Sequence, residues 1–504
     1  LSSSSAASDV YKRQQDTMRI AIVGAGFAGI GMGIQLKAAG YRNFTIYEKS
    51  KSLGGTWRDN TYPGCACDVA SHLYSFSFEK NSDWPNVFSK SKDILQYLIY
   101  CAEKYKIIPH VKFEEEITEL RYNQETLEWT LNTASDEKEI FDAIINGTGP
   151  LNKPFIPNIE GLNQFKGEMF HSSAWEHDSD LVGKTVACIG TGASAIQFIP
   201  EIVGKVKKLN VFQRTPTWLV PRMDRSYSTI TKKLFKYIPG INWIYRTFLY
   251  WRNEYYGMAI MGYPFFNAIL QKASLFYLRV KVKDPSLRQK LTPEYQIGCK
   301  RINISDDYYS ALQRTHSELI TEPIELVTKN GVVTSDGKEH PCDTIIFGTG
   351  FKTQEFLQPM KIYGCDDVEL TESWGEKAKS FMGISISGFP NYFLLLGPNT
   401  GLGHNSVVFM IESQIKYVIE TLNFMSSKNI KAVDVKEEHQ EKFYLASQKK
   451  LKRLSWGTGC NSWYLSKNGE NFTIWPGFST SYWWKTLKFP VSKYLLHKAR
   501  KISQ

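Results

Sequence analysis

The stretch Arg19-Ile-Ala-Ile-Val-Gly24-Ala-Gly26-Phe-Ala-Gly29 decides the fold of this 504-residue chain. Its first five residues are typical of a buried parallel strand, and the residues after the glycines have the apolar spacing of a helix up to Ala39. A strand, glycines and a helix in this order predict a dinucleotide-binding turn. Gly24 permits the tight turn, Gly26 allows the backbone to approach a pyrophosphate, and Gly29 allows the helix to pack closely on the strand.

A second strand, 44–47, leads directly into Glu48, which lies 24 residues after Gly24. An acidic residue at this point of a dinucleotide-binding fold binds the ribose hydroxyls. The N-terminus of the helix after the glycines is expected to face the phosphate charge. The first fold is therefore predicted to hold FAD or NAD.

The same pattern recurs at residues 185–195, where the strand Thr185–Ile189 precedes Gly-Thr-Gly-Ala-Ser-Ala and an alanine replaces the third glycine. Arg214 lies 24 residues after the first glycine of this motif, the offset that the acid has in the first fold. A guanidinium suits a 2′-phosphate, whereas a carboxylate suits free ribose hydroxyls. The second fold is therefore predicted to bind NADPH. Its expected contacts are Gly190, Gly192, Ala195, Arg214 and Thr215.

Two dinucleotide folds in one chain indicate an oxidoreductase that passes hydride from a nicotinamide to a flavin. Two near-repeats, 142–149 and 343–350, each predict a short strand that ends in Gly-Thr-Gly and carries the chain between domains. Residues 222–297 interrupt the alternation of strands and helices, and we expect a helical insertion there. The predicted fold class is α/β, with two doubly wound Rossmann-like dinucleotide-binding domains and this insertion.

The expected domain division follows from these segments. Residues 1–17 are expected to form a disordered or non-native tail, because Met18 stands directly before the first strand. The FAD-binding domain is expected at 18–150 and again at 355–504. The NADP-binding domain is expected at 151–221 and 298–354, on either side of the insertion at 222–297.

Charge and cysteine usage narrow the classes of partner. The 61 basic and 50 acidic residues are spread along the chain, without zinc-finger spacing or a basic region followed by heptads, so no nucleic-acid partner is expected. An anionic cofactor or a membrane surface explains the excess of charge equally well. The insertion is interpreted as a packed helical subdomain, or alternatively as aromatic, basic helices in peripheral contact with a membrane. The 8 scattered cysteines predict reduced thiols, no metal site and a cytoplasmic location.

Two further motifs carry a family resemblance. Phe165-x-Gly167-x-x-x-His171-x-x-x-Trp175 resembles the fingerprint of type I Baeyer–Villiger monooxygenases, which usually continue with Pro or Asp where this chain has Glu176. A longer family pattern, from Gly55 through Trp57 and Tyr62-Pro63-Gly64 to Asp68, matches at every specified position. The resemblance extends from Met18 to about Phe489.

The resemblance implies a reaction and its cofactors. FAD reduced by NADPH would react with O2 to give a peroxide at flavin C4a, which attacks an apolar ketone and inserts one oxygen atom to form an ester or lactone. The segment Gly298-Cys-Lys300-Arg301 is similar to the family segment that supplies a catalytic arginine, here Arg301. Asp68 would hold and tune that arginine. Lys300 would be a second contact to the 2′-phosphate.

Other positions receive roles by the same resemblance. His171 and Trp175 are expected to couple the rotations of the two nucleotide domains. The segment 460–464 resembles a loop that closes over the nicotinamide, with Trp463 as the contact, although a core aromatic is the alternative. Further cofactor contacts implied by the family pattern are Gly55, Thr56, Trp57 and Asp68.

The loop 397–405 precedes an apolar helix that is expected from Val407 to Ile419. It is expected to aim the helix N-terminus at the flavin, with Asn399 as a contact. His404 in this loop is interpreted as a solvated or capping residue.

Two other functions stay open at this point. One is a heteroatom oxygenase, in which a protonated peroxide oxidises sulfur or nitrogen. The other is a flavoprotein that releases peroxide and acts as an NADPH oxidase or redox sensor.

Overall fold

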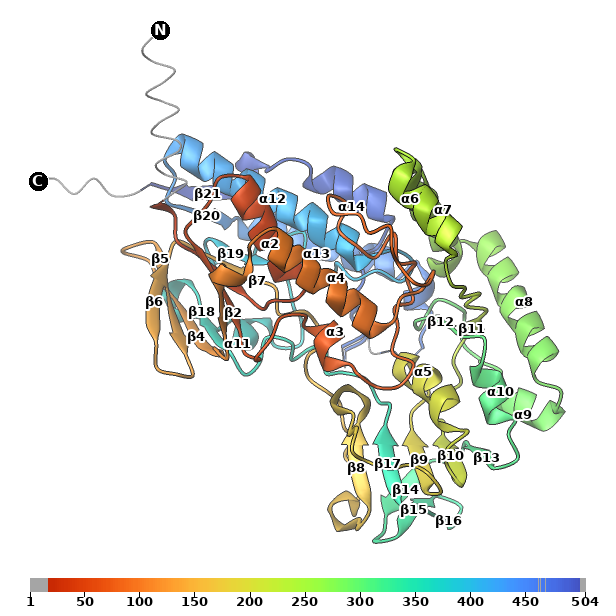
Figure 1. Ribbon diagram of the computed structural model, residues 1–504. Helices are drawn as coiled ribbons and strands as arrows, with labels where there is room; N and C mark the ends of the chain where they lie inside the picture. The colour runs from red at the N-terminus through yellow and green to blue at the C-terminus, as the bar shows by residue number, and fades with distance from the viewer. Residues whose placement is uncertain (1–16, 461, 463, 467, 499–504) are drawn as a thin grey trace, which may run out of the picture.

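The computed structural model describes residues 17–460, 462, 464–466 and 468–498, and two five-stranded parallel sheets organise it (Figure 1). The first sheet has the order β19-β7-β1-β2-β3. Its strands are β1 (Ile20–Val23), β2 (Phe44–Glu48), β3 (Val111–Phe113), β7 (Ala143–Asn146) and β19 (Tyr392–Leu394). Because β19 comes from the C-terminal part of the chain, this sheet is built from two distant segments.

The second sheet has the order β13-β10-β9-β17-β8. Its strands are β8 (Glu168–His171), β9 (Thr185–Ile189), β10 (Lys208–Phe212), β13 (Ser317–Ile320) and β17 (Thr344–Phe347). Every adjacent pair in both sheets is parallel. The predicted fold class, two Rossmann-like folds with a helical insertion, is therefore confirmed.

Each parallel sheet is covered on both faces, as strands without a polar side require. Helices α2 (Phe27–Ala38), α4 (Ser91–Lys104) and α12 (Val407–Lys428) share the core of one face of the first sheet. The antiparallel sheet β18-β4-β5-β6 packs on the other face. Helices α5 (Ala193–Ile202) and α10 (Tyr308–Leu312) cover one face of the second sheet, and part of the β14-β15-β16 sheet joins the core on the other.

The remaining elements connect these layers. The small sheets consist of β4 (Ile117–Asn123), β5 (Glu128–Thr133), β6 (Lys138–Phe141), β18 (Lys361–Tyr363), β14 (Ile324–Val327), β15 (Gly331–Thr334), β16 (Glu339–Pro341), β11 (Leu219–Val220), β12 (Asn303–Ile304), β20 (Ala432–Val435) and β21 (Tyr494–His497). The other helices include α3 (Thr56–Asp59), α11 (Leu370–Trp374), α13 (Glu437–Leu451) and α14 (Ser479–Thr486).

Residues 222–297 form the expected helical insertion, with α6 (Thr229–Tyr237), α7 (Ile241–Ile260), α8 (Pro264–Lys281) and α9 (Pro285–Lys290). In Figure 1 these helices make up the right-hand edge of the molecule. Within the described ranges, no helix combines the length and the apolar character needed to cross a membrane.

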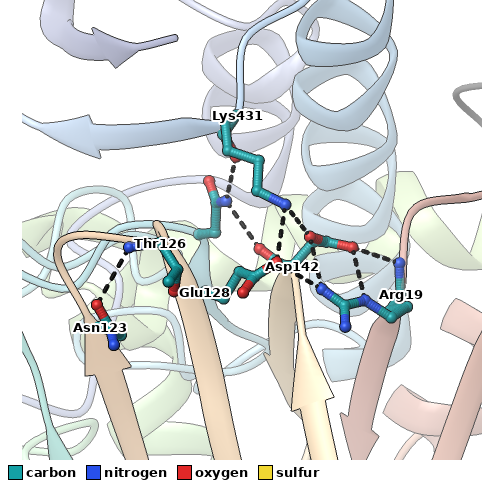
Figure 2. Close-up of polar contacts among 7 residues, drawn as sticks. Arg19, Asn123, Thr126, Glu128, Asp142 and Lys431 are labelled. Carbon is teal, nitrogen blue, oxygen red and sulfur yellow. Dashed lines mark hydrogen bonds and ion pairs between the residues drawn. The ribbon is translucent and has the colours of Figure 1, made fainter. Parts of the chain in front are cut away.

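A cluster of charged residues lies at the amino ends of β1 and β7 (Figure 2). The Asp142 carboxylate accepts hydrogen bonds from the backbone and guanidinium of Arg19 and forms an ion pair with Lys431. Burial alone would raise the pKa of Asp142, but these partners outweigh burial and lower it. Glu128 pairs with the same two cations, at 2.7 Å from Arg19 and 3.3 Å from Lys431. The cluster therefore joins β1, β7 and β5 to the C-terminal segment at the end of the strands away from the glycine turns.

Candidate active site

One cavity of about 1920 Å³ receives residues from both predicted dinucleotide turns. Gly24 and Gly26 line it from the first sheet, and Gly190 and Gly192 line it from the second. Small-molecule pockets usually measure about 300–1000 Å³. The cavity therefore has room for more than one ligand, and ligands held by the two turns would share it.

The first turn has the geometry that its glycines predict. Gly24 adopts a φ of +91°, and a Cβ on Gly29 would overlap the carbonyl oxygen of Gly24. A Cβ on Gly26 would meet nothing nearer than the Cα of Gly55, at 3.8 Å. Gly26 also caps α2 without any side-chain hydrogen bond, so the amides of the first helical turn stay available to an anion. These features fit a pyrophosphate.

Glu48 is buried at the end of β2 and lines the cavity. Its carboxylate accepts hydrogen bonds from the amides of Ala25 at 2.9 Å and Ser50 at 3.0 Å. Arg58 from α3 completes the arrangement, with its guanidinium 3.1 Å from the carboxylate. Glu48 therefore fixes the glycine turn in addition to facing the cavity. Arg58 was missed by the sequence analysis, although it directly follows the family motif at 55–57.

The motif at 55–57 lies opposite the first turn. Gly55 has a φ of +52° and caps α3, and a Cβ there would lie 3.4 Å from the Cα of Gly26. Thr56 and Trp57 follow and line the cavity. The Trp57 ring is buried and meets the Tyr74 ring edge-on at 5.4 Å between centroids. The structure therefore brings all three predicted contacts to the cavity beside the first glycine turn.

The second turn repeats the first with one exchange of residues. Gly190 has a φ of +106°, and a Cβ there would lie 2.6 Å from the carbonyl oxygen of Gly348. Gly192 caps α5 without a side-chain hydrogen bond, and a Cβ there would meet nothing nearer than the Gly348 carbonyl oxygen, at 3.8 Å. Ala195, the replacement for the third glycine, faces Gly348, where an added Cβ would come within 3.0 Å of the alanine methyl. Gly348 therefore provides the space that the alanine occupies.

The predicted 2′-phosphate contacts come together. Arg214, Thr215 and Lys300 all line the cavity. Burial lowers the pKa of Lys300, and the nearby positive charge of Arg214 lowers it further. The Lys300 ammonium also lies 4.9 Å from the centre of the Tyr295 ring. Two cations on the wall of the same cavity suit a doubly charged anion.

Arg301 and Asp68 form an ion pair in the same cavity. The Arg301 guanidinium donates to the Asp68 carboxylate at 3.0 Å. Burial alone would lower the pKa of Arg301, but the carboxylate outweighs burial and raises it, so the side chain carries a permanent charge. The Arg301 side chain is 42% exposed and Asp68 only 12%. The cation therefore has a surface that a ligand in the cavity can reach, whereas the acid stands behind it.

Gln197 connects this pair to the second fold. Its amide nitrogen donates to the second Asp68 oxygen at 3.2 Å and to the Ala66 carbonyl at 3.0 Å. Its amide oxygen accepts a hydrogen bond from the Tyr62 hydroxyl at 3.0 Å. Because Gln197 is on α5, the helix of the second turn holds the loop that carries Asp68. Gln197 was not among the residues expected from the sequence, although a lone amide among Ile196, Phe198 and Ile199 is a signal that points to it.

His171 and Trp175 do not line the cavity, and only His171 contacts one of the two chain segments that connect the sheets. His171 ends β8 and its ring contacts Phe351 at 5.8 Å. The connecting strands hydrogen bond to each other, from the Phe155 amide to the Gly350 carbonyl at 2.8 Å. Trp175 packs edge-on against Phe170 at 5.1 Å. His171 therefore contacts a connecting segment, whereas Trp175 packs on the core of the second fold, and their role in coupling the two domains stays a prediction.

The loop 397–405 has a different structure from the expected one. Asn399 does not line the cavity, and its amide donates to the backbone carbonyls of Asn471 and Ile474. His404 does line it, and its side chain is 1% exposed, so the expectation of a solvated or capping histidine is wrong. Its Nε2 lies 3.2 Å from Glu254 of α7. The burial of His404 depends on Glu254 of the insertion, so the sequence around His404 does not predict it.

Glu254 is the centre of that buried network. It also accepts hydrogen bonds from Asn405 at 3.0 Å and from the amide and hydroxyl of Ser479 at 3.1 and 2.6 Å. Burial would raise the pKa of Glu254, but the hydrogen bonds from His404, Ser479 and Asn405 hold it at about 2. A single carboxylate therefore joins the insertion, the loop at 397–405 and the start of α14.

Cys299 and Cys460 form a disulfide across 161 residues of sequence. The expectation of reduced thiols is therefore wrong for these two residues, and the cysteines no longer support a reducing compartment. Tertiary packing brings their Cα atoms to 6.3 Å, which no spacing in the sequence indicates. The bond ties the segment before Lys300 to the loop that contains position 463. Trp463 itself lies outside the described residues, as do residues 1–16 of the predicted tail.

Known proteins are similar to this chain over nearly its whole length. A family model described as flavin-binding monooxygenase-like matches residues 17–251. A curated Baeyer-Villiger monooxygenase from Pseudomonas aeruginosa is 43% identical over 480 residues, covering 95% of this chain and 91% of that protein. A solved structure of OTEMO in complex with FAD and NADP has a TM-score of 0.86 at 25% identity, covering 95% and 99% of the two chains. A closed structure of cyclohexanone monooxygenase has a TM-score of 0.86 at 26% identity, covering 96% and 100%.

Proposed function

The chain belongs to the Baeyer–Villiger monooxygenases among the flavin-binding monooxygenases, and from this premise we propose that it inserts one oxygen atom from O2 into an apolar ketone, giving an ester or lactone. It is a FAD- and NADPH-dependent enzyme. The ion pair of Arg301 with Asp68 is the observation that carries the proposal, because it puts a permanent cation into a cavity that both glycine turns share.

The two turns fit the two cofactors. Gly26 and Gly192 have no protein atom within 3.8 Å of an added Cβ and stand at helix N-termini without a side-chain cap, where a pyrophosphate can approach the backbone. Glu48 at the first turn suits ribose hydroxyls, and Arg214 with Lys300 at the second suits a 2′-phosphate. When bound, FAD supplies the activation of oxygen and NADPH supplies the hydride.

Arg301 is proposed as the catalytic residue. Its guanidinium stabilises the negative charge that develops on oxygen as a ketone carbonyl is attacked, and the ion pair with Asp68 holds it in place before that charge appears. Asp68 has the role of a positioning residue, because it holds the guanidinium from behind and limits its net field. Gln197 fixes the second oxygen of Asp68, so the position of the cation depends on α5.

The proposed substrate is apolar because one wall of the cavity is apolar. Helices α7 and α8 contribute Phe248, Tyr255, Phe266, Ile269 and Phe276 to this wall. Side chains of this kind stabilise a hydrocarbon ligand by removing its surface from water, at about 25 cal/mol per Å². A ketone with a sizeable hydrocarbon body therefore gains more from this wall than a small polar one.

The decisive experiment follows NADPH oxidation by the purified holoenzyme with cyclic and aryl ketones and identifies the product by mass. The expected product has gained one oxygen atom as an ester, and Arg301→Ala is expected to abolish it while FAD stays bound. Ketone-independent NADPH consumption with stoichiometric hydrogen peroxide would instead identify an oxidase. Acceleration by sulfides or amines alone would identify a heteroatom oxygenase.

A further inference from the structure

Helix α7 of the insertion turns its polar side toward the protein and its apolar side outward. The side that packs against the protein is largely polar and includes Asn242, Arg246, Asn253 and Glu254. The side that faces outward is apolar and includes Trp243, Ile244 and Trp251, which are 57–60% exposed. A surface helix of a water-soluble domain ordinarily has the opposite arrangement, with its apolar stripe toward the core. The outward side of α7 is therefore built for surroundings other than water.

Polar contacts fix this orientation. Arg246 is buried and donates to the carbonyl of His72 at 2.8 Å, and it lies 3.7 Å from Glu412 of α12. Glu254 holds the start of α14 through the Ser479 amide. Rotation of α7 that hid its aromatic residues would turn Arg246 and Glu254 away from the protein and leave their buried partners Glu412 and His404 unpaired, which is costly. These buried polar contacts therefore keep the apolar side of α7 exposed.

The neighbouring helix α8 shows the same reversal. Its buried residues include Asn267, which donates to the carbonyls of Ala259 and Ile297, and Ser274, which donates to the carbonyl of Leu219. Phe265, by contrast, is 69% exposed. The outward apolar side chains of α6, α7 and α8 form the insertion patch. Its principal members are Ile230, Tyr237, Trp243, Ile244, Trp251 and Phe265.

The patch is unusual in its extent. Among the described residues, 16 of the 31 exposed large hydrophobic side chains lie between Met223 and Val280. Scattered single residues of this kind are normal on protein surfaces, but a contiguous apolar patch marks a site of contact with a partner or a membrane. Tryptophan and tyrosine are enriched where proteins meet the boundary between lipid and water. The composition of the patch thus favours lipid.

The charges around the patch indicate which lipid. Residues 229–281 contain eight basic residues and one acidic residue, Glu254. Glu254 and Arg246 are buried, so seven basic side chains and no acidic one remain at the surface of this segment. These are Lys232, Lys233, Lys236, Arg252, Lys272, Arg279 and Lys281. A second copy of the chain docked on the same patch would oppose like charges, whereas an anionic surface attracts them.

We infer that the insertion patch binds the surface of an anionic phospholipid bilayer, with its aromatic side chains in the interface and its basic side chains at the headgroups. Phe248, Tyr255 and Phe276 are exposed and also line the cavity, so the cavity opens on this side. A ketone dissolved in the bilayer would then enter without crossing water. Only this last step rests on the proposed function; lipid binding does not.

The test is sedimentation of the FAD-loaded, full-length protein with vesicles of phosphatidylcholine containing about 30 mol% phosphatidylglycerol, against vesicles of phosphatidylcholine alone. Binding to the anionic vesicles is expected to be at least about tenfold tighter, and about 0.5 M NaCl is expected to weaken it. The double variant Trp243→Glu/Trp251→Glu is expected to lose most of this binding. Neither tryptophan lines the cavity, so turnover of a water-soluble ketone should be unchanged.

The matched control is Ile140→Glu. Ile140 is 46% exposed and belongs to β6, a strand at the opposite edge of the molecule in Figure 1. This variant should bind vesicles like the wild type. Equal vesicle binding by wild type and double variant, or no binding by either, would overturn the inference. So would a dimer, seen by light scattering, that the double variant dissociates while no vesicle binding occurs. Vesicle binding is measured without a ketone. Absence of ketone turnover would therefore count against the proposed function alone and not against lipid binding.

Discussion

The Asp68 carboxylate and the Arg301 guanidinium lie 3.0 Å apart although 233 residues separate them in the chain. Asp68 follows the first glycine turn, and Arg301 follows the insertion. Gln197 holds the other oxygen of Asp68 from the second fold. Three segments of the chain therefore have to be in place before the cavity contains a correctly oriented cation.

Asp68→Asn keeps the shape of the side chain and removes its charge. Because the guanidinium is then no longer held by an ion pair, ketone-dependent turnover should fall about 100-fold, the size seen when one preorganised group of an active site is lost. NADPH oxidation should continue with release of hydrogen peroxide. The measurement is ester formed per NADPH consumed, with Asp83→Asn, an exposed acid in the same segment, as the control. An unchanged ratio in Asp68→Asn would remove Asp68 from the mechanism.

Arg214→Ala and Lys300→Ala should each raise the KM for NADPH by about tenfold to 100-fold, since a hydrogen bond to a charged group contributes about 1.5–3 kcal/mol. Turnover at saturating NADPH should change little, and the KM for NADH should be nearly unaffected. Steady-state kinetics with both nucleotides checks this. A collapse of turnover at constant KM would contradict the assignment of a 2′-phosphate site.

The lowered pKa of Lys300 predicts how binding of NADPH changes with pH. Burial and then Arg214 lower the pKa of Lys300, so the lysine loses its proton at a lower pH than an ordinary lysine. The value of kcat/KM for NADPH should therefore decline in the alkaline range below the usual lysine pKa of about 10.4. Arg214→Ala removes one cause of the shift and should move this decline to higher pH. A profile that does not move would show that the two cations are not coupled.

Two glycines of the first turn should respond differently to the same substitution. Gly29→Ala places a methyl group on the Gly24 carbonyl oxygen, so the protein itself should be destabilised, by about 1–3 kcal/mol for overpacking. Gly26→Ala meets no protein atom nearer than 3.8 Å, so Tm of the apoprotein should be nearly unchanged while FAD content falls. Thermal unfolding and the ratio of FAD to protein distinguish the two. Equal effects on apoprotein Tm would contradict a role of Gly26 in close approach to FAD.

Glu254→Gln should lower the free energy of unfolding by about 3 kcal/mol at pH 7. This order of magnitude follows because a difference of one pKa unit corresponds to about 1.36 kcal/mol. The folded-state pKa of Glu254 is about 2, below the unfolded value near 4.3. Its contribution is therefore complete above pH 4.3 and is lost as the pH falls toward 2. Urea unfolding at several pH values should show the difference between wild type and variant shrinking in that window. A difference independent of pH would mean that the charge is not what matters.

Titration of free thiols tests the disulfide between Cys299 and Cys460. Unreduced, denatured protein should titrate six thiols, because two of the 8 cysteines are joined, and prior reduction should raise the number to eight. Cys299→Ser frees the loop at 460 from the segment before Lys300, so it should raise the KM for NADPH and lower stability by about 2–4 kcal/mol. Cys365→Ser, which changes an unpaired and half-buried cysteine, is the control. Eight thiols without reductant would exclude the bond.

Local sequence was enough for those parts of the site that local backbone geometry defines. The turns at Gly24 and Gly190, their strands and their helices formed as expected, because the order of strand, glycines and helix fixes them over short distances. The offset of 24 residues shared by the two folds pointed to Arg214, whereas Lys300 was expected from the family resemblance, and packing of distant segments brings it near Arg214. Helix α12 was expected to end at Ile419 and continues to Lys428, where Asn429 adopts a left-handed conformation at its end.

Other features were decided only when distant segments packed together. His404 is buried because Glu254 of the insertion reaches it, and Cys299 meets Cys460 because the C-terminal loop returns to the segment that follows the insertion. The family pattern suggested that Arg301 and Asp68 belong together, but their contact depends on Gln197 and α5.

The sequence by itself therefore determined two dinucleotide turns, the class of fold and the residues that suit a phosphate or a ribose, because these depend on a few neighbouring positions. Only the tertiary structure decided which buried charges are paired, which cysteines are joined and which side of the insertion faces outward. The physical reason is that burial and pairing depend on the partner across the chain, and a residue's neighbours in sequence do not specify that partner.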